Sequence, residues 1–391
     1  MSDLLSIEDA LAAMLARVVP LEAEDVAAGD AAGRILSEPA RAAVDLPPFP
    51  SSAMDGFAVR AEDAPGELSV VARVAAGRPV DRALRAGEAI AIATGGVVPE
   101  GADAVVPIEN VEEVGDRVRI AAAVSKKDNI RRRGGDVEAG ETVLGAGRRL
   151  GPAQVGALAA AGLATVACAR RPRAAVLATG TELRPPGAAL RPGEIYESNT
   201  FTLAAQLADA GAVVERLAGV EDDEAATRDA LERGLAGDVL VTSGGVSVGP
   251  HDLVRRALVD LGADEVFWRV AVRPGKPVAF AVRGRTLVFG LPGNPVSALV
   301  GFELFVRPAV RALQGADPGP VYRTARLARA ARRDPARDAL LRARLDGGEA
   351  APLSGQESHM IVRAAAANAL VLVPRGEGEL VAGTEVNYLP L

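Results

Sequence analysis

Three glycine- and proline-rich loops lie close together in this chain, and each follows a short apolar run. The loops cover 243–249, 273–277 and 290–297, and the apolar runs before them cover 239–242, 266–270 and 286–289. Apolar runs of this length, bounded by turn residues, are typical of buried strands, and open α/β sheets bind ligands where their strands end. Glycines let backbone N–H groups approach an anion, and a helix N-terminus adds partial positive charge. The pattern therefore predicts an α/β domain whose loops hold an anionic ligand.

Strand-like and helix-like segments alternate regularly around these loops, from residue 173 to about 315. The last helix of the series is expected to begin with Asn294 as its N-cap and Pro295 at its first position. Such alternation predicts a series of βαβ units with a parallel or mixed sheet. Strands are expected at 174–178, 212–217 and 238–242, and helices at 200–210, 224–235 and 252–261.

The rest of the chain predicts three further parts. Ser6 is placed to cap an amphipathic helix that ends near Pro20, and Pro47 marks the start of a β-rich segment. In that segment, the strand-like stretches 103–111 and 117–124 are expected to form a hairpin. We expect a discontinuous linking domain (1–46 and 138–172), an inserted β-rich lobe (47–137), the α/β domain (173–318) and a small C-terminal β domain (319–391).

Composition excludes several classes of function. The 391 residues carry a net charge of −7 and only 3% aromatics, which argues against binding to nucleic acid or to anionic membranes. A single cysteine, Cys168, and two histidines, His251 and His359, leave no disulfide framework and make a Cys/His metal site improbable. The N-terminus lacks the basic start of a signal peptide, and no apolar run is long enough to span a bilayer, so we expect a cytoplasmic protein.

Lys276 is the candidate anion ligand in the α/β domain. The other two lysines are Lys126 and Lys127, and arginine supplies the remaining basic residues, so a lysine between Gly275 and Pro277 indicates a need for a compact charge. The alternative is a surface lysine in a turn.

Four acids are expected at the same edge of the predicted sheet: Glu182, Asp222, Asp223 and Asp252. Carboxylates beside a phosphate-binding loop suit Mg²⁺, which prefers oxygen ligands. The alternative interpretation is that they cap helices or are solvated, since Asp252 begins a predicted helix.

The β-rich lobe carries a second cluster of polar residues. Asp55 lies in a Met-Asp-Gly bend, Thr94 precedes a glycine pair, and Asp136 ends the basic run that begins at Arg131. Arginine clusters bind phosphates well, although an Asp-Gly pair is usually only a turn and a charge run is usually a solvated surface.

In their combination and order, these segments resemble the MoeA family of molybdopterin molybdenumtransferases, to which the E domains of gephyrin and Cnx are related. The resemblance spans nearly the whole chain and rests on segments 52–56, 93–95, 131–134, 243–249, 274–277 and 290–297. It implies an elongated four-domain subunit that forms a homodimer, with a central domain like that of MogA. The implied reaction inserts molybdate into adenylylated molybdopterin with Mg²⁺ and releases AMP.

The resemblance also assigns roles to single residues. Molybdate would be held by Ser247, Arg273, Lys276, Ser297 and Arg342. The acidic positions Asp222 and Asp252 would be catalytic and hold the metal, and Asp55, Thr94 and Asp136 would be functional residues of the lobe. The remaining substrate-binding residues would be Glu182, Ser243, Gly244, Gly245, Pro292, Gly293 and Asn294.

The sequence also departs from the family pattern. Pro50 and Ser51 stand where the family often has Asp-Asn, and Arg269 and Arg273 stand where it often has lysine. The two arginines keep the positive charge but alter the geometry with which an oxyanion is contacted.

Two other functions fit the same residues. One is a MogA-type adenylyltransferase, which usually lacks the N-terminal lobe and the terminal β domain. The other is a pterin-binding scaffold without catalysis. A MogA-type enzyme is also a candidate transient partner, because it would make the substrate.

Overall fold

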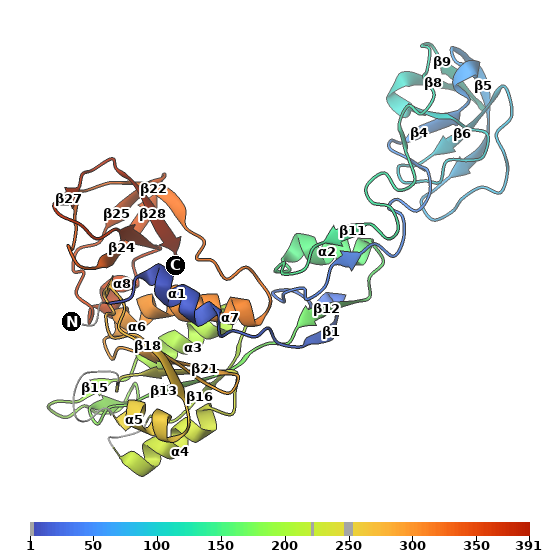
Figure 1. Cartoon of the computed structure of the whole chain (residues 1–391). Helices are drawn as coiled ribbons and strands as arrows, with labels where there is room; N and C mark the ends of the chain where they lie inside the picture. The colour runs from blue at the N-terminus through green and yellow to red at the C-terminus, as the bar shows by residue number, and fades with distance from the viewer. Residues whose placement is uncertain (1–3, 220–222, 246–252) are drawn as a thin grey trace.

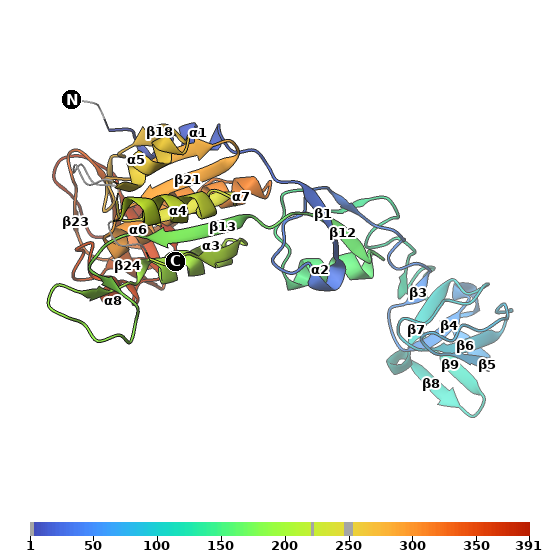
Figure 2. The same ribbon diagram turned by 90° about the horizontal axis from the view of Figure 1, so that it is seen from below.

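The computed structural model describes residues 4–219, 223–245 and 253–391. The molecule is elongated: an α/β domain and a C-terminal β domain lie together at one end, and a β-rich lobe lies at the other (Figure 1). A narrow linking region joins the two ends, and the view from below shows the same separation (Figure 2). Within the described residues, none of the helices combines the length and the apolar character that crossing a bilayer requires.

The α/β domain is built on a six-stranded sheet with the order β16-β13-β17-β21-β20-β18. The first four strands in this order are parallel, and β20 is antiparallel to both of its neighbours. The mixed sheet agrees with the prediction, and β18 therefore ends at the same edge as the parallel strands. The strands are β13 (Arg173–Ala178), β16 (Val213–Arg216), β17 (Val239–Ser243), β18 (Asp264–Trp268), β20 (Ala279–Arg283) and β21 (Thr286–Leu291).

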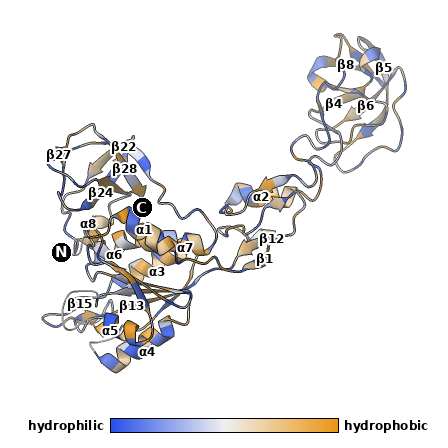
Figure 3. Cartoon of the chain, in the orientation of Figure 1, coloured by the Kyte–Doolittle hydropathy of each residue, from blue (hydrophilic) through white to orange (hydrophobic). Residues whose placement is uncertain are grey.

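Helices cover both faces of this sheet, because each strand in the middle of the sheet is apolar on both sides. On one face, Leu203 and Phe305 pack into a large apolar core, and on the other face Leu231 and Leu258 form a smaller one. Helix α4 carries polar and apolar residues on different sides, as a helix with one buried face does (Figure 3). The helices are α3 (Asn199–Asp209), α4 (Glu224–Gly234), α5 (Leu253–Asp260), α6 (Pro295–Gly301) and α7 (Arg307–Leu313), with the π-helical stretch η4 (Phe302–Val306) between the last two.

The first helix, α1 (Ile7–Leu15), packs against α7 and η4 of the α/β domain. The Ser6 hydroxyl accepts a hydrogen bond from the Asp9 backbone N–H at 3.0 Å, which is the predicted cap. Ile7 and Met14 are buried in the larger core of the α/β domain. The sequence predicts that this helix belongs to the linking domain, and the structure differs because the apolar face of the helix is covered by α7.

The C-terminal residues form a barrel whose ring β24-β25-β22-β28-β26 closes through pairing of β24 with β26. A short strand from the α/β domain, β19 (Val272–Arg273), pairs in parallel with β24 and ties the two domains together. The ring strands are β22 (Arg323–Leu327), β24 (Asp338–Asp346), β25 (Glu349–Pro352), β26 (Ala369–Val373) and β28 (Glu385–Pro390). The remaining elements are β23 (Ala331–Arg332), α8 (Ile361–Ala364) and β27 (Glu379–Leu380).

The linking region is small and joins two chain segments that are far apart in sequence. Strand β1 (Ala23–Ala27) pairs antiparallel with β12 (Thr165–Ala169), and β2 (Ala40–Arg41) pairs with β11 (Thr142–Leu144). Helix α2 (Pro152–Ala160) and the 3₁₀ turn η1 (Ala28–Asp30) complete it, around a core that includes Leu158 and Cys168.

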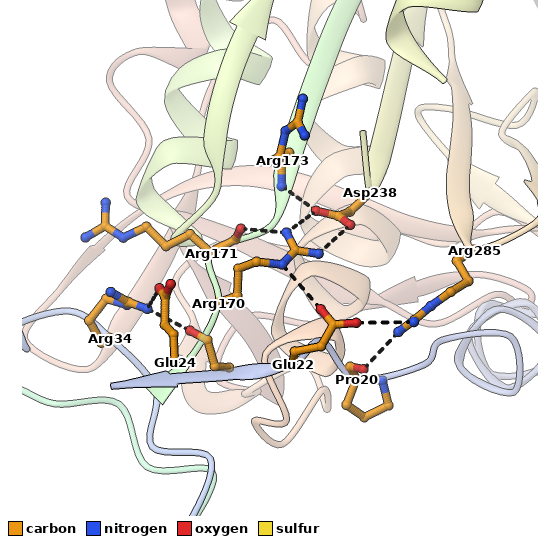
Figure 4. A network of polar contacts seen from close by, with 10 residues as sticks. Pro20, Glu22, Glu24, Arg34, Arg170, Arg171, Arg173, Asp238 and Arg285 are labelled. Carbon is orange, nitrogen blue, oxygen red and sulfur yellow. Dashed lines mark hydrogen bonds and ion pairs between the residues drawn. The ribbon is translucent and has the colours of Figure 1, made fainter. Parts of the chain in front are cut away.

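A polar network fixes this region to the α/β domain (Figure 4). Arg170 donates two hydrogen bonds to the Asp238 carboxylate, at 2.8 and 2.9 Å. Glu22 accepts from Arg170 and Arg285, both at distances over 3 Å. Arg170 follows β12 and Glu22 precedes β1. The network therefore lies where the two chain segments that connect the linking region to the α/β domain meet that domain. We call these four residues, Glu22, Arg170, Asp238 and Arg285, the crossing network.

The distal lobe contains a six-stranded sheet with the order β7-β4-β6-β5-β9-β8. A hairpin turn at Gly115 and Asp116 is present as predicted, but it joins β8 to β9. The sequence predicts a first hairpin strand over 103–111, whereas the 3₁₀ turn η3 (Ile108–Asn110) separates β7 from β8, and these two strands lie at opposite edges of the sheet. The strands are β4 (Gly56–Val59), β5 (Gly66–Val74), β6 (Glu88–Ile92), β7 (Ala104–Pro107), β8 (Val111–Val114) and β9 (Arg117–Ile120).

Two shorter strands and another 3₁₀ turn belong to the same lobe. Strand β3 (Ser51–Ser52) pairs antiparallel with β10 (Ile130–Arg131), and η2 (Ala61–Asp63) follows β4. The β3–β10 pair lies where the chain enters and leaves the lobe.

Candidate functional site

The glycine-rich loops after β17 and β21 meet at one edge of the α/β sheet. The Asn199 side-chain amide donates to the Ser243 hydroxyl oxygen and to the Gly293 carbonyl, both at 2.8 Å. The Ser243 hydroxyl in turn donates to the Pro292 carbonyl at 3.2 Å. The two loops are therefore held together by the first residue of α3.

A cavity of about 640 Å³ lies beside these loops. Four of the predicted substrate-binding residues line it: Glu182, Ser243, Gly293 and Asn294. Asn294 is at the N-cap position of α6, as predicted, but its side chain makes no capping hydrogen bond. The wall also includes residues that the sequence analysis did not select: Thr179, Tyr196, Glu197, Asn199 and His359.

Glycine is required at position 244 for two reasons. Gly244 has a φ of +91°, and a Cβ atom there would lie 2.6 Å from the Thr179 carbonyl oxygen. Gly245 also has a positive φ, +65°. Glycine adopts these conformations at low cost. Because it has no side chain, it also lets the loop backbone lie close to the end of the neighbouring strand.

The third predicted loop, which carries Lys276, lies against the start of α6. A Cβ atom on Gly275 would lie 3.5 Å from the Ser297 carbonyl oxygen. Lys276 is exposed, and Ser297 is buried at 3%. The structure therefore brings Lys276, Ser297 and Gly293 to the same edge of the sheet.

Arg273 faces the C-terminal barrel. It lines a hollow on the barrel side, of about 520 Å³, together with Asp334 and Gln356. Its guanidinium is 3.9 Å from the Asp334 carboxylate, and pairing of β19 with β24 fixes its backbone. The barrel thus contributes to the surroundings of the predicted anion loop.

Arg342 lines neither the main cavity nor the hollow on the barrel side. It is 1% exposed and donates to the carbonyls of Gly355, Glu357 and Met360 at 2.7, 3.2 and 2.9 Å. Burial lowers the pKa of this guanidinium. In this structure these contacts hold the loop that carries His359 at the cavity wall. The contact with molybdate that the resemblance implies for Arg342 stays a prediction.

Three predicted site residues, Ser247, Asp222 and Asp252, lie outside the described residues. Among residues 4–219, 223–245 and 253–391, no group of three or more His, Cys, Asp or Glu side chains is arranged to hold a metal ion.

The distal lobe brings its predicted residues together independently. Thr94 donates to one carboxylate oxygen of Asp55 twice, from its backbone N–H at 2.6 Å and from its hydroxyl at 2.9 Å. These bonds, the backbone one first, hold the pKa of the exposed Asp55 carboxyl below its usual value. Asp55 is thus an ionised acid with a fixed position on the surface of the lobe.

The basic run lies next to this acid. Pairing of β3 with β10 sets Arg131 opposite Ser51, and the Ala53 N–H donates to the Asn129 carbonyl at 2.8 Å. Asp136 bonds through its backbone to Leu46, at the entrance of the lobe. Gly56 is also required here, because a Cβ atom would lie 2.0 Å from the Val106 carbonyl oxygen of the paired strand.

Within one subunit the two groups of residues are far apart. The lobe that carries Asp55 and Thr94 and the domain that contains the cavity lie at opposite ends of the molecule in both views (Figures 1 and 2). A reaction that uses both groups therefore needs a second subunit or a large movement.

The most informative residue missed by the sequence analysis is Asn199. An asparagine at a helix start is usually interpreted as a cap, and nothing in its surroundings indicates that it bridges two loops 44 and 94 residues away. His359 was missed because the C-terminal domain shows no pattern that places it against the α/β domain.

The chain as a whole has the architecture of a multidomain α/β enzyme with a ligand cavity at the sheet edge. Three family models match it in order: the MoeA N-terminal region (domain I and II) over residues 5–162, a probable molybdopterin binding domain over 175–312, and the MoeA C-terminal region (domain IV) over 324–391.

Similar proteins agree along nearly the full length. Molybdopterin molybdenumtransferase 2 of Mycobacterium tuberculosis is 40% identical over 377 residues, covering 92% of this chain and 93% of the relative. The Haemophilus influenzae molybdopterin molybdenumtransferase is 38% identical over 80% of this chain and 78% of its own. A crystal structure of a MoeA protein from Pyrococcus horikoshii superposes with a TM-score of 0.83 at 32% identity, covering 99% of both chains.

The chain therefore belongs to the molybdopterin molybdenumtransferase (MoeA) family, as the sequence resemblance indicated. It is an enzyme of molybdenum cofactor biosynthesis that transfers molybdenum, and its substrate is related to molybdopterin.

Proposed function

We propose that this enzyme inserts molybdate into adenylylated molybdopterin in a magnesium-dependent reaction that releases AMP. The observation that carries the proposal is the convergence of two glycine-rich loops and the Lys276 loop at one sheet edge, beside a cavity of about 640 Å³. Backbone N–H groups and cations at such an edge suit a substrate with several anionic groups. In this reaction the first two loops and Lys276 would contact the substrates, as the sequence predicts.

The chemistry needs no oxidant or reductant. Two Mo–S bonds form to the pterin thiols, and one oxo group of molybdate leaves as water that carries the two thiol protons. A second water cleaves the phosphoanhydride bond, giving AMP and the pterin phosphate. The chain would bind and orient the two anions so that the sulfurs face the molybdenum, which is catalysis by positioning and electrostatic stabilisation.

Magnesium belongs to the proposal through Asp222 and Asp252, which are its proposed ligands. When bound, the ion would neutralise charge on the phosphates. Asp252→Asn should abolish molybdate-dependent AMP release while leaving the thermal unfolding temperature nearly unchanged. Activity near that of the wild type in this variant would return Asp252 to the role of a helix cap.

A homodimer is the second part of the proposal. It is supported by the separation, within one subunit, between the lobe that carries Asp55 and Thr94 and the domain that contains the cavity (Figures 1 and 2). In a two-fold dimer, the lobe of one subunit can reach the α/β domain of the other. Light scattering should show a dimer at micromolar concentration, and a fully active monomer would contradict this part.

The direct test of the reaction supplies adenylylated molybdopterin with and without molybdate and measures AMP. A MogA-type adenylyltransferase would instead consume molybdopterin and ATP, and a scaffold would bind the pterin without turnover. The family matches at 5–162 and 324–391 favour the transferase over a MogA-type enzyme, and the name of the curated relatives favours it over a scaffold.

The proposal places the reaction in the cytoplasm, with a transient contact to a MogA-type enzyme that hands on the substrate. Cell fractionation and a binding assay with the purified adenylyltransferase test these two points.

A further inference from the structure

A second hollow, of about 600 Å³, adjoins the main cavity at the outer edge of the α/β sheet. The two hollows share the wall residues Ala178, Leu183 and Glu197. The second hollow is also lined by Arg216, which ends β16, the edge strand of the sheet. It therefore opens at the same sheet edge as the glycine-rich loops.

An aromatic ring is exposed in this hollow. The chain has eight phenylalanines, and the structure buries six of them. The other two are Phe49, in the segment that leads to the lobe, and Phe201, which is 44% exposed and lines the second hollow. Leaving a large apolar ring in water is unfavourable, so a ligand that covers Phe201 would gain binding free energy from its burial.

Arg216 lies over this ring and is held in place. Its guanidinium carbon is 3.5 Å from the centre of the Phe201 ring, and it donates to the Thr200 hydroxyl oxygen at 3.1 Å. Thr200 is fixed in turn by the Glu197 carboxylate, which accepts from its backbone N–H at 2.7 Å. The guanidinium and the ring together form a preorganised stack at the surface of the hollow. Flat heteroaromatic bases stack well on both groups.

Strand order gives the direction of a bound substrate. The Lys276 and Gly293 loops belong to the β21 side of the site, and β16 is three strand positions away, which corresponds to about 14 Å. The pterin sulfurs must meet molybdate on the β21 side. The far end of an adenylylated pterin then points to β16.

From this geometry we infer that the second hollow binds the adenine ring of the adenylylated substrate, stacked on Arg216 and Phe201. The inference rests on the proposed function for the identity of the substrate. It assigns the AMP end of the ligand to the β16 edge and the pterin end to the main cavity.

The test is equilibrium binding of AMP to the full-length protein, measured by calorimetry. Phe201→Leu keeps an apolar side chain but removes the ring, and Arg216→Ala removes the guanidinium. Each should weaken AMP binding by about tenfold to a hundredfold. Phe49→Leu is the matched control, because it changes the other exposed phenylalanine, and it should bind AMP as the wild type does.

The outcomes separate the possible occupants. If the hollow binds adenine, Phe201→Leu should leave the affinities for a simple pterin and for inorganic phosphate unchanged. Loss of pterin binding in place of AMP binding would overturn the inference, and so would unchanged AMP affinity in both variants or no AMP binding to the wild type. Circular dichroism of each variant confirms that the fold is retained.

Failure of the proposed function is recognised separately. Without molybdate-dependent AMP release from adenylylated molybdopterin, the reaction is wrong even if AMP binds in the second hollow. Normal release together with unchanged AMP affinity in both variants would reject only the assignment of the hollow.

Discussion

The α/β site and the lobe site use different means to present their functional groups. In the α/β domain the loops after β17 and β21 are shaped by glycines and tied by Asn199, so backbone groups surround a cavity. In the lobe a single carboxylate, Asp55, is held on the surface by two bonds from Thr94. The first arrangement suits binding of a large anion, and the second suits the action of one ionised acid on a ligand bound elsewhere.

This difference predicts that substitutions in the lobe act on turnover and those in the α/β site act on binding. The crossing network lies between the two and should affect their relative orientation. The following experiments test that division, beginning with the largest expected effect.

Asp55→Asn should lower turnover by about a hundredfold or more, in the range typical of a lost acid–base or charged group. Pterin binding should be nearly unchanged, because the residues that line the cavity come from the α/β domain and the C-terminal domain and none comes from the lobe. Steady-state kinetics with a pterin binding assay distinguish the two effects. If Asp55→Asn weakened pterin binding and left turnover normal, the proposed division between a lobe that acts on turnover and an α/β site that acts on binding would be wrong.

Lys276→Ala should raise the molybdate concentration for half-maximal turnover by about tenfold to a hundredfold, since a charge-assisted contact is lost. Lys276→Arg should restore only part of the affinity, because a planar fork does not replace a compact charge. Turnover is measured over a molybdate series with pterin held constant. Lys126→Ala, in the lobe, is the control and should behave as the wild type; an unchanged half-saturation point in Lys276→Ala would make this residue a turn lysine.

Arg170→Ala should destabilise the protein by about 1–3 kcal/mol, because the largely buried Asp238 carboxylate loses both hydrogen bonds from Arg170 and keeps only the one from the Arg173 backbone N–H. Small-angle scattering should also show a wider range of lobe positions. Arg285→Ala is the matched control in the same network and should cost less than about 1 kcal/mol, since its pair with Glu22 is exposed. An equal loss of unfolding free energy in both variants would show that the Arg170–Asp238 pair stabilises the protein no more than the exposed pair does.

Thr94→Ala should give the smallest effect, a rise in the pKa of Asp55. The hydroxyl bond is lost while the backbone N–H bond remains. Because the wild-type pKa is lowered, the ionised form is the one stabilised by these bonds, and this stabilisation is lost as pH falls through the folded-state pKa. The acidic limb of the activity profile should therefore move to higher pH, and NMR titration of the Asp55 carboxyl carbon checks it. A shift to lower pH would contradict the assigned hydrogen bonds.

Several elements were predictable because their signals are local. The apolar runs before the glycine-rich loops became β17, β18 and β21, and the Ser6 cap begins α1. The sequence placed Gly244 in a loop near the sheet edge, and the structure shows that Thr179 leaves no room for a side chain. The sequence resemblance also identified the family, because the order of several short motifs is specific even where each motif alone is weak.

Other features were decided only by tertiary packing. Helix α1 buries its apolar face on α7, β7 and β8 lie at opposite edges of the lobe sheet, and β19 joins the C-terminal barrel. Arg342 was assigned to the ligand, but its guanidinium is buried against three carbonyls. The sequence determined which segments form strands, helices and glycine-rich loops, because these follow from neighbouring residues. Contacts between segments far apart in the chain, such as Asn199 with Gly293, depend on how the domains pack, and one sequence carries no local signal for them.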